Sequence, residues 1–425
     1  MKYIKCNQKY KDLSKNNQYI LLQYNMIYSF LKNENKTSKY IWFKFLIILF
    51  FIIINFYLIF IYASYNNYFL KDTNINPNLK EKFLKELYFI QSCLNDRKIK
   101  SFEKYDKPKI TMVIPFYNAE KYLTRLLISI QNQELKELEI IFVEDCSTDK
   151  GLKLLEKYSK IDKRIRIIKN KENKGCFYSY AIGILEAKAN HTMILDDDDM
   201  LLSNLKELYE ISYKNNKDIN DFGFIQGGLK NFDEIIRKDQ ILYQPKIGEM
   251  IFTHNYIGCT FIVNKIYKTE IVKNAIRTLK KEYFDSNIII HCDTFLFIHI
   301  FYFVKSYQSY SNLFGYFHIF NEDTASGNIS NKYNKLFQDT LYLVKYVSEM
   351  KYTSKYIYNR HIRFAIDILK WPIELCGERK LKVDWNNFNK VMNKILNNKN
   401  LNKKNINELY SLIKIIKRKN LNQLI

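Results

Sequence analysis

The sequence lacks the two glycine-rich motifs by which many proteins hold phosphate groups. Its 425 residues contain neither a G-x-G-x-x-G fingerprint nor a G-x-x-x-x-G-K-[ST] loop, which excludes phosphate binding in the dinucleotide or the P-loop manner. The seven cysteines include no C-x-x-C pair, and His291-Cys292-Asp293 is too compact for a tetrahedral zinc site. These spacings leave the question of disulfides open.

A nucleic-acid-binding signature is also missing. The formal net charge is +23, but the lysines are scattered through a chain that is also rich in Asn, Ile and Tyr, and no RNA- or DNA-binding motif accompanies them. We therefore expect no nucleic-acid partner. We interpret the charge as a compositional bias that a nearby membrane and phosphate-bearing ligands make tolerable.

The chain has one long apolar run, Phe45 to Ala63, in which Asn55 is the only strongly polar residue. A transmembrane helix needs about 20 apolar residues, whereas a core helix is rarely apolar on every side over such a length. A cleaved signal peptide has a shorter apolar core that starts nearer the amino terminus. We predict a single-pass membrane anchor, in the Golgi or endoplasmic reticulum if the source is eukaryotic. The lysines that crowd its amino-terminal flank favour a cytosolic amino terminus.

Four consecutive aspartates, Asp196 to Asp199, follow a second, short apolar run. In an extended chain the first and third would project to one face, and the second and fourth to the other. Two carboxylates on one face repel each other in a low-dielectric cleft unless a cation lies between them. Mg²⁺ or Mn²⁺ is commonly held by one or two carboxylates together with substrate phosphates. Alternatively, the aspartate run is the N-terminal approach to a helix that begins at about Asn204. Ser203 would cap that helix, and the aspartates would interact favourably with its dipole.

From Ile110 onward, short apolar runs alternate with helical patterns. This alternation predicts an α/β domain with a mostly parallel sheet flanked by helices. The predicted strands are Ile110 to Ile114, Leu138 to Val143, Ile165 to Ile168 and Thr192 to Leu195. Open α/β sheets bind ligands at the carboxyl ends of their strands. The polar residues that follow these ends are Asn118, Glu144 with Asp145, Asn173 with Gly175, and the aspartate run.

In this order, the motifs resemble those of the family 2 glycosyltransferases, over Ile110 to about Ser326. The matching segments are Ile114-Pro115-Phe116-Tyr117-Asn118, Ile140 to Asp149, Asn173-Lys174-Gly175, Leu195 to Asp199 as the D-x-D element, Asn264 to Lys268, Asp293-Thr294-Phe295-Leu296, Tyr316-Phe317-His318 and Ala325-Ser326. Four residues depart from the family pattern. Tyr180-Ala181 replaces a common Arg-Asn pair, Cys146 replaces a glycine, and Cys292 stands where an acidic residue often precedes the base.

The resemblance implies a GT-A fold and inverting, metal-dependent transfer of a hexosyl or N-acetylhexosaminyl group. The donor would be a UDP- or GDP-sugar and the acceptor a hydroxyl of a glycan, lipid or protein. Asp145 would accept the base N–H, Asp196 would contact the ribose, Asp198 would bind Mn²⁺ or Mg²⁺, and Asp293 would be the general base. The other expected donor-binding residues are Pro115, Tyr117, Asn118, Asn173, Gly175 and Asp197.

Two alternatives remain open at this point. The chain could be a catalytically degenerate, membrane-anchored relative that only binds nucleotide or glycan. Asp293 could be a helix N-cap instead of the general base. It would cap an apolar helix from Phe295 to Val304, and aspartate is a favoured N-cap residue.

The expected organisation has five parts. Residues 1–44 form a cytosolic tail, 45–63 the anchor, and 64–108 a stalk with one amphipathic helix, in which Phe83, Leu87, Ile90 and Leu94 recur at helical spacing. Residues 109–328 form the catalytic domain and 329–425 a helical region without a functional interpretation.

Overall fold

The computed structural model describes residues 84–85, 90, 92, 99–227, 232–235, 238–244, 246–247, 261–284, 288–289, 291–319, 332–350, 355–375 and 383–421. The chain divides into two compact units, Met1–Asn74 and Ile75–Ile425, and all of these residues belong to the second. The predicted tail and anchor and most of the stalk lie outside the described residues. Within the described residues, no helix combines the length and the apolar character needed to cross a membrane.

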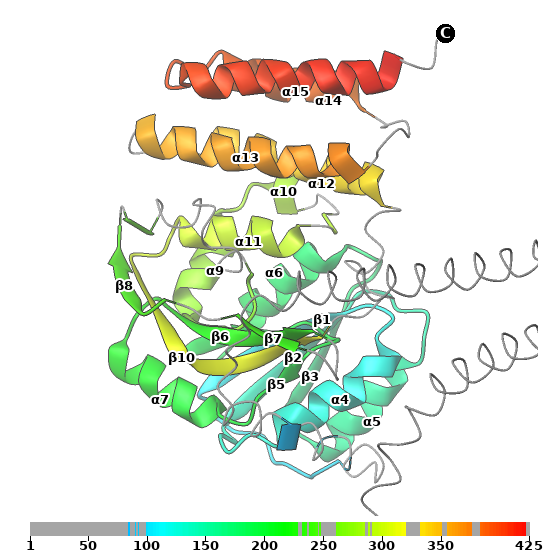
Figure 1. Ribbon diagram of the computed structural model, residues 1–425. Coiled ribbons are helices and arrows are strands. Elements are labelled where there is room, and N and C mark those ends of the chain that lie inside the picture. The colour runs from blue at the N-terminus through cyan, green and yellow to red at the C-terminus, as the bar shows by residue number, and fades with distance from the viewer. Residues whose placement is uncertain are drawn as a thin grey trace, which may run out of the picture. The chain divides into compact units, whose positions relative to one another are not determined.

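A ten-stranded sheet lies at the centre of the second unit (Figure 1). Its strands are β1 (Ile110–Phe116), β2 (Leu138–Glu144), β3 (Ile165–Lys169), β4 (His191–Ile194), β5 (Met200–Leu201), β6 (Ile219–Gly227), β7 (Phe232–Ile235), β8 (Gln240–Tyr243), β9 (Lys265–Lys268) and β10 (Ser306–Ile319). The strand order is β3-β2-β1-β4-β9-β6-β10-β5, with β7 beside β6 and β8 beside β10. Every residue of β1 and β2 is buried, as expected for central parallel strands covered on both faces.

The predicted α/β class is confirmed, but the predicted dominance of parallel pairing is wrong. The four strands foreseen from the sequence, β1 to β4, pair in parallel. In contrast, β9 runs antiparallel to both of its neighbours, β4 and β6. Four of the nine pairings between described strands are parallel and five are antiparallel. Each crossover helix returns the chain to the same end of the sheet and so makes a parallel neighbour, but this strand–helix repeat ends at β4.

Helices cover both faces of the sheet (Figure 1). One face carries α4 (Glu120–Gln131), α5 (Gly151–Ile161) and α7 (Leu205–Asn215), and the other carries α6 (Cys176–Glu186), α9 (Thr269–Thr278), the short α10 (Lys281–Phe284) and α11 (Cys292–Phe301). The contact of α6 with the sheet requires a glycine, because a Cβ at Gly183 would lie 2.4 Å from Cγ1 of Val113. This close packing fixes α6, which begins directly after the loop that follows β3.

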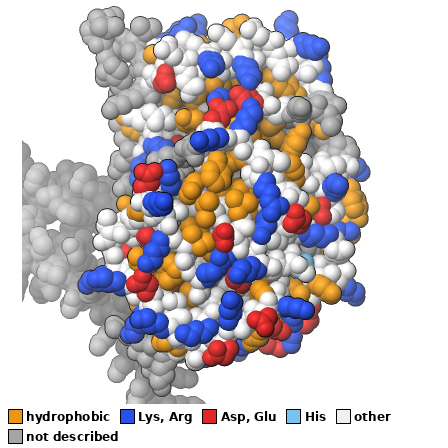
Figure 2. All heavy atoms as spheres, turned by 180° about the vertical axis from the view of Figure 1, so that it is seen from behind, with side chains coloured by type: hydrophobic (Ala, Val, Ile, Leu, Met, Phe, Trp, Pro, Cys, Tyr) orange, Lys and Arg blue, Asp and Glu red, His pale blue; other side chains and the backbone are white. Residues whose placement is uncertain are grey.

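Four further helices form the carboxyl-terminal region: α12 (Tyr333–Glu349), α13 (Lys355–Leu375), α14 (Trp385–Leu396) and α15 (Lys403–Leu421). In α12, the hydroxyl of Tyr346 meets Nδ1 of His299 in α11, and Asp339 accepts a hydrogen bond of 3.2 Å from the backbone N–H of Ile289. The helical region therefore supports α11 directly. On the face shown in Figure 2, Lys and Arg side chains are spread among acidic and apolar ones rather than gathered in one stripe.

Glu349, the last residue of α12, joins three helical segments. Its Oε2 accepts hydrogen bonds of 2.9 Å from Lys280 and from Tyr283, next to and within α10, and its Oε1 accepts one of 3.0 Å from Lys394 in α14. Partial burial alone would raise the pKa of Glu349, but these hydrogen bonds lower it to about 2. Because the folded pKa lies below the ordinary value of 4.5, the ionised carboxylate stabilises the fold above that pH, and this contribution is lost as the pH falls toward 2.

We predict that Glu349→Gln lowers the free energy of unfolding at pH 7 by about 1–3 kcal/mol, because three donors lose a charged acceptor. The difference from the wild type should shrink below pH 4.5, because Glu349 then becomes protonated in the unfolded chain while it stays ionised in the folded protein down to about pH 2. Urea unfolding at pH 7 and pH 3 measures both effects. Glu282→Gln is the matched control, since Glu282 is about half exposed and an exposed ion pair contributes at most about 1 kcal/mol. A constant difference across this pH range would show that the charge of Glu349 is not what stabilises the junction.

Candidate active site

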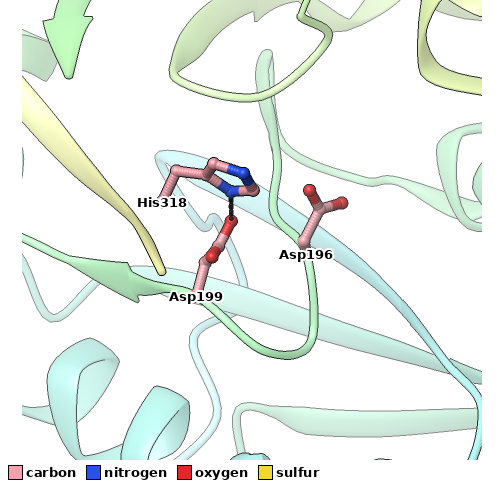
Figure 3. A group of neighbouring side chains, drawn as sticks. All are labelled: Asp196, Asp199 and His318. Carbon is pink, nitrogen blue, oxygen red and sulfur yellow. Dashed lines mark hydrogen bonds and ion pairs between the residues drawn. The ribbon is translucent and has the colours of Figure 1, made fainter. Parts of the chain in front are cut away.

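The aspartate run forms a turn between β4 and β5, not an extension of the strand. The predicted alternation of its side chains is therefore wrong, since alternation requires extended backbone. Ligand atoms of Asp196, Asp199 and His318 lie within 4.8 Å of one another and form a group that could hold a metal ion (Figure 3). The predicted ligand, Asp198, lies in the same turn, where its backbone carbonyl accepts a hydrogen bond from the Arg125 guanidinium. A metal contact of the Asp198 side chain stays a prediction.

Asp199 is fully buried and accepts three hydrogen bonds from β10. The Tyr316 hydroxyl donates to Oδ2 at 2.6 Å, the Ile319 backbone N–H donates to Oδ1 at 2.8 Å, and Nδ1 of His318 lies 3.0 Å from Oδ2. Figure 3 shows the imidazole of His318 directly over the carboxylate of Asp199, with the carboxylate of Asp196 to one side. Metal-binding histidines commonly donate one ring N–H to a carboxylate in this way and keep the other nitrogen for the metal.

The electrostatics of this group indicate a place for a cation. Burial, followed by the charges of Asp199 and Asp198, raises the pKa of Asp196 to about 8. Burial and the charges of Asp198 and Asp196 also hold the pKa of Asp197 well above its ordinary value. Burial lowers the pKa of His318, but its hydrogen bond to Asp199 and the nearby carboxylates outweigh burial and raise it to about 9. Carboxylate oxygens and an imidazole nitrogen are ligands that suit Mn²⁺, so the residues present fit a divalent cation.

Tyr180 completes the surroundings of Asp196. Its hydroxyl donates a hydrogen bond to Oδ1 of Asp196, and its ring is buried. Burial and the charge of Asp196, with a smaller effect of Asp293, raise the pKa of Tyr180 well above its ordinary value. A neutral phenol from α6 therefore stands at a position where the resembled family commonly carries an Arg-Asn pair.

The loops after β1, β2 and β3 converge as predicted. The backbone N–H groups of Lys174 and Gly175 donate to the carboxylate of Asp145 at 2.8 and 2.7 Å, and the Asn173 side chain donates to its carbonyl at 3.1 Å. Asn118, at a φ of 54°, accepts from the backbone N–H of Thr148 at 2.7 Å. Asp145 is only 3% exposed, and the two backbone hydrogen bonds to its carboxylate hold the loop after β3 against the loop after β2. Its contact with a nucleotide base stays a prediction.

The opening turn lies beside the aspartates. The backbone N–H of Tyr117 donates to Oδ2 of Asp197 at 3.3 Å, while the Tyr117 side chain is 49% exposed. Pro115 is buried within β1 and shapes the strand that leads to this turn.

The two helix-cap alternatives are wrong. The N-cap position of α7 is Asn204, not Ser203, and its side chain makes no capping hydrogen bond. Gln133 instead accepts from the Leu205 backbone N–H at 3.1 Å. The N-cap position of α11 is His291, and Asp293 lies in the first turn. The predicted helix from Phe295 to Val304 thus starts three residues earlier, at Cys292.

Asp293 has the properties of a proton acceptor. Its Oδ1 accepts from the backbone N–H of Thr294 at 2.6 Å and lies 3.3 Å from the Thr294 hydroxyl. Burial raises the pKa of Asp293 and outweighs the opposite effect of these hydrogen bonds. A raised pKa suits a carboxylate that takes up a proton near neutral pH.

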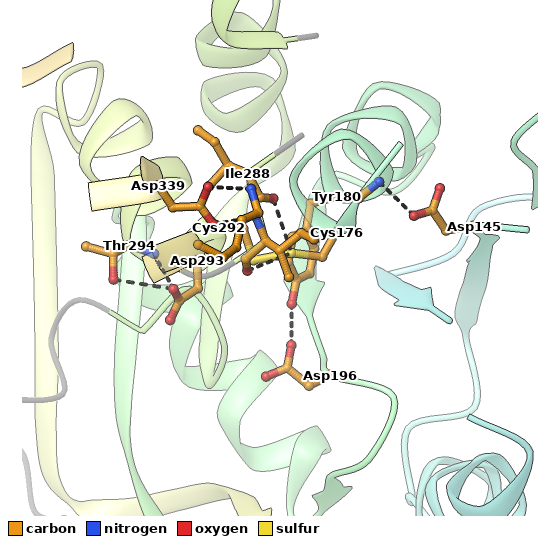
Figure 4. Close-up of a disulfide and its surroundings, with 12 residues drawn as sticks. Asp145, Cys176, Tyr180, Asp196, Ile288, Cys292, Asp293, Thr294 and Asp339 are labelled. Carbon is orange, nitrogen blue, oxygen red and sulfur yellow. Dashed lines mark hydrogen bonds and ion pairs between the residues drawn. A yellow bond between two sulfur atoms is a disulfide. The ribbon is translucent and has the colours of Figure 1, made fainter. Parts of the chain in front are cut away.

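Sequence reasoning missed several residues of the site. His318 was noticed only as part of a closing-strand motif, and Tyr180 only as a departure from the family pattern. The spacings also left the disulfide undecided, whereas the structure joins Cys176 at the start of α6 to Cys292 at the start of α11 (Figure 4). Among the described cysteines, Cys146 is free.

Comparison with known proteins identifies the domain. Residues 111–275 match the family model for glycosyl transferase family 2. Glycosyltransferase GlyG of Streptococcus pneumoniae is 31% identical over 126 residues, which are 29% of this chain and 40% of GlyG. The teichoic acid poly(glycerol phosphate) polymerase of Staphylococcus epidermidis is 37% identical over 108 residues, which are 25% of this chain and 15% of the polymerase. The chain thus spans less than half the length of either relative.

The fold is also similar to that of a solved structure, residues 1–349 of S. aureus TarS in complex with UDP-GlcNAc. The TM-score is 0.54 at 16% sequence identity, and the alignment covers 73% of this chain and 89% of TarS 1–349. At this identity the likeness shows the fold alone. Together with the matched family model and the glycosyltransferase relatives, it indicates that the chain contains a glycosyl transferase family 2 domain with a GT-A fold.

Proposed function

We propose that the protein transfers one sugar, with inversion, from a nucleoside diphosphate sugar to a hydroxyl acceptor, and that the reaction depends on a divalent cation. The observation that carries the proposal is the assembly of two acidic centres at one edge of the sheet. Asp196, Asp199 and His318 form the first. Asp293 is the second, and its charge reaches Tyr180, which is hydrogen-bonded to Asp196. Transfer from a diphosphate donor needs both a cation site for the leaving group and a base for the acceptor.

The donor is proposed to lie over the loops after β1, β2 and β3. Asp145, Asn173 and Gly175 are joined there by hydrogen bonds, and Tyr117 is tied to Asp197. TarS, which has the same fold, was solved with UDP-GlcNAc, which supports a UDP-sugar as the donor class. The acceptor is a hydroxyl on a glycan, lipid or protein.

Each group has a separate task in the proposed reaction. Asp196 and His318, with Asp198 from the same turn, would hold Mn²⁺ or Mg²⁺. When bound, the cation supplies Lewis-acid stabilisation of the charge that develops on the departing diphosphate. Asp199 orients His318, and Tyr180 orients Asp196.

Asp293 acts on the acceptor. Its carboxylate takes the proton of the acceptor hydroxyl as that oxygen bonds to the anomeric carbon, on the face opposite to the breaking bond to the diphosphate. The products are the glycosylated acceptor and the nucleoside diphosphate. The membrane anchor and the topology lie outside the described residues and stay predictions.

We predict that full-length protein binds UDP at least about tenfold more tightly in Mn²⁺ than in chelator, because the cation offsets the repulsion between the carboxylates and the diphosphate. Asp198→Asn and His318→Gln should each remove most of this gain. Isothermal titration calorimetry measures the affinities. Asp239→Asn is the control, since Asp239 is an exposed carboxylate that accepts from Ser311, outside the metal group. Equal UDP affinity in chelator and in Mn²⁺ would contradict the metal dependence.

We predict that Asp293→Asn reduces transfer to the acceptor by a factor of about 10² or more, because an amide cannot take up the proton. The melting temperature should stay within a few degrees, because Asn can still accept from the Thr294 N–H and the lost helix-dipole interaction contributes only about 0.3–1 kcal/mol. Kinetic assays and thermal melting measure the two effects. Asp384→Asn is the matched control, since Asp384 is an N-cap residue that accepts from Asn387 at 3.1 Å. Near wild-type turnover in Asp293→Asn would remove Asp293 from the mechanism.

A further inference from the structure

A disulfide joins two helices of the site. One is α11, which carries the proposed base Asp293, and the other is α6, which carries Tyr180, the hydrogen-bond partner of Asp196. The sulfurs of Cys176 and Cys292 are bonded, across 116 residues of sequence. Each cysteine is the first residue of its helix, α6 and α11 respectively. Asp293 directly follows Cys292, and Tyr180 lies one helical turn after Cys176, so that both flank the bond (Figure 4). The bond therefore lies beside the proposed base.

The α6 end of this bond is held independently of the disulfide. The residues just before Cys176, Lys174 and Gly175, donate backbone hydrogen bonds of 2.8 and 2.7 Å to the carboxylate of Asp145. Further along α6, Gly183 packs closely against Val113 of the sheet. Breaking the disulfide would leave these contacts in place, so the donor loops would keep their arrangement.

At its first turn, α11 is joined to α6 by the disulfide, and the segment before it is tied to α12 by the hydrogen bond from the Ile289 N–H to Asp339. The body of α11 is anchored by Phe295, which packs on Phe177 with ring centroids 5.1 Å apart, and by Nε2 of His299, 2.6 Å from the carbonyl of Ala275. In contrast, the turn into the helix passes through His291 at a φ of 66°, a left-handed conformation that a Cβ disfavours. The hydrogen bonds to Asp293 come from Thr294 in the same helix. They orient the carboxylate within α11 but do not set its distance from α6.

Resting on the proposed function, we propose that the Cys176–Cys292 disulfide positions the general base. Cys176 and Cys292 are positioning residues, which hold the first turn of α11 so that Asp293 meets the acceptor hydroxyl at the anomeric carbon of the donor. A misplacement of about 1 Å can cost about 10² in rate. The bond should therefore matter for turnover and not for donor binding.

A dithiol reductant converts the bonded form into the open form. The S–S bond accepts two electrons and two protons, which leaves two cysteine thiols, and the dithiol closes to its own disulfide. In the open form Cys176 carries a thiol, whose S–H can donate to the carbonyl of Ile289, 3.5 Å from the sulfur. This contact keeps the neighbouring segment near α6 but no longer fixes Cys292.

The test uses the purified full-length chain in three states: oxidised, reduced with dithiothreitol, and as the double variant Cys176→Ala with Cys292→Ala. Peptide mapping by mass spectrometry first determines whether the two cysteines are bonded. We expect kcat for transfer to fall by about tenfold to a hundredfold on reduction, while the UDP Kd and donor KM change less than about twofold. The double variant should have the same low kcat, and dithiothreitol should not change it further.

Two results would overturn the proposal: both cysteines found as thiols in fully active protein, or an unchanged kcat after complete reduction. If the double variant does not fold, the reduced wild type provides the same comparison. If oxidised protein transfers no sugar from any donor, the proposed function fails, and hydrogen exchange of peptides covering residues 291–296 then decides the positioning role alone. Faster exchange after reduction supports a disulfide that holds this turn, and unchanged exchange refutes it.

Discussion

The site depends on the hydrogen bonds between the buried carboxylate of Asp199 and strand β10. A buried carboxylate is costly unless hydrogen bonds or charges compensate it, and here the three groups that are hydrogen-bonded to it, Tyr316, His318 and the Ile319 N–H, come from β10. This requirement pins the turn after β4 to a strand more than a hundred residues later in the chain. It sets the direction of His318, and with it the shape of the group that could hold a metal ion.

The sequence predicts the part of the fold that depends on local pattern. Strands β1 to β4 and the convergence of their loops follow from apolar runs and from the geometry of parallel sheets. The conformation of the aspartate run does not follow, because four aspartates in series fit a strand end or a turn equally well. The donors to Asp199 decide between them, and no local pattern shows those donors. For the same reason Lys265 is easily taken for an exposed residue, whereas it is fully buried against Asp221 at 3.3 Å.

The contacts that hold the region of Asp293 also come from distant parts of the chain, so the sequence alone does not reveal them. Sequence identifies the aspartate as a candidate base, but the features that hold it come from elsewhere: a cysteine on α6, a phenylalanine ring on the same helix, and side chains of α12. The first of the carboxyl-terminal helices, α12, lies against the helix that carries the proposed base, through Tyr346 and His299.

The long strand β10 limits where the chain can be truncated. The stretch that matches the family model ends at residue 275, before Asp293, Tyr316 and His318. A protein cut there would keep the motifs through Lys268, yet it would bury Asp199 without its partners and would lack both the imidazole of His318 and the proposed base, Asp293. The stretch that matches the family model is thus not a self-sufficient module. A truncation that preserves this group of side chains has to keep the chain through β10, because that strand closes the site that the first strands begin.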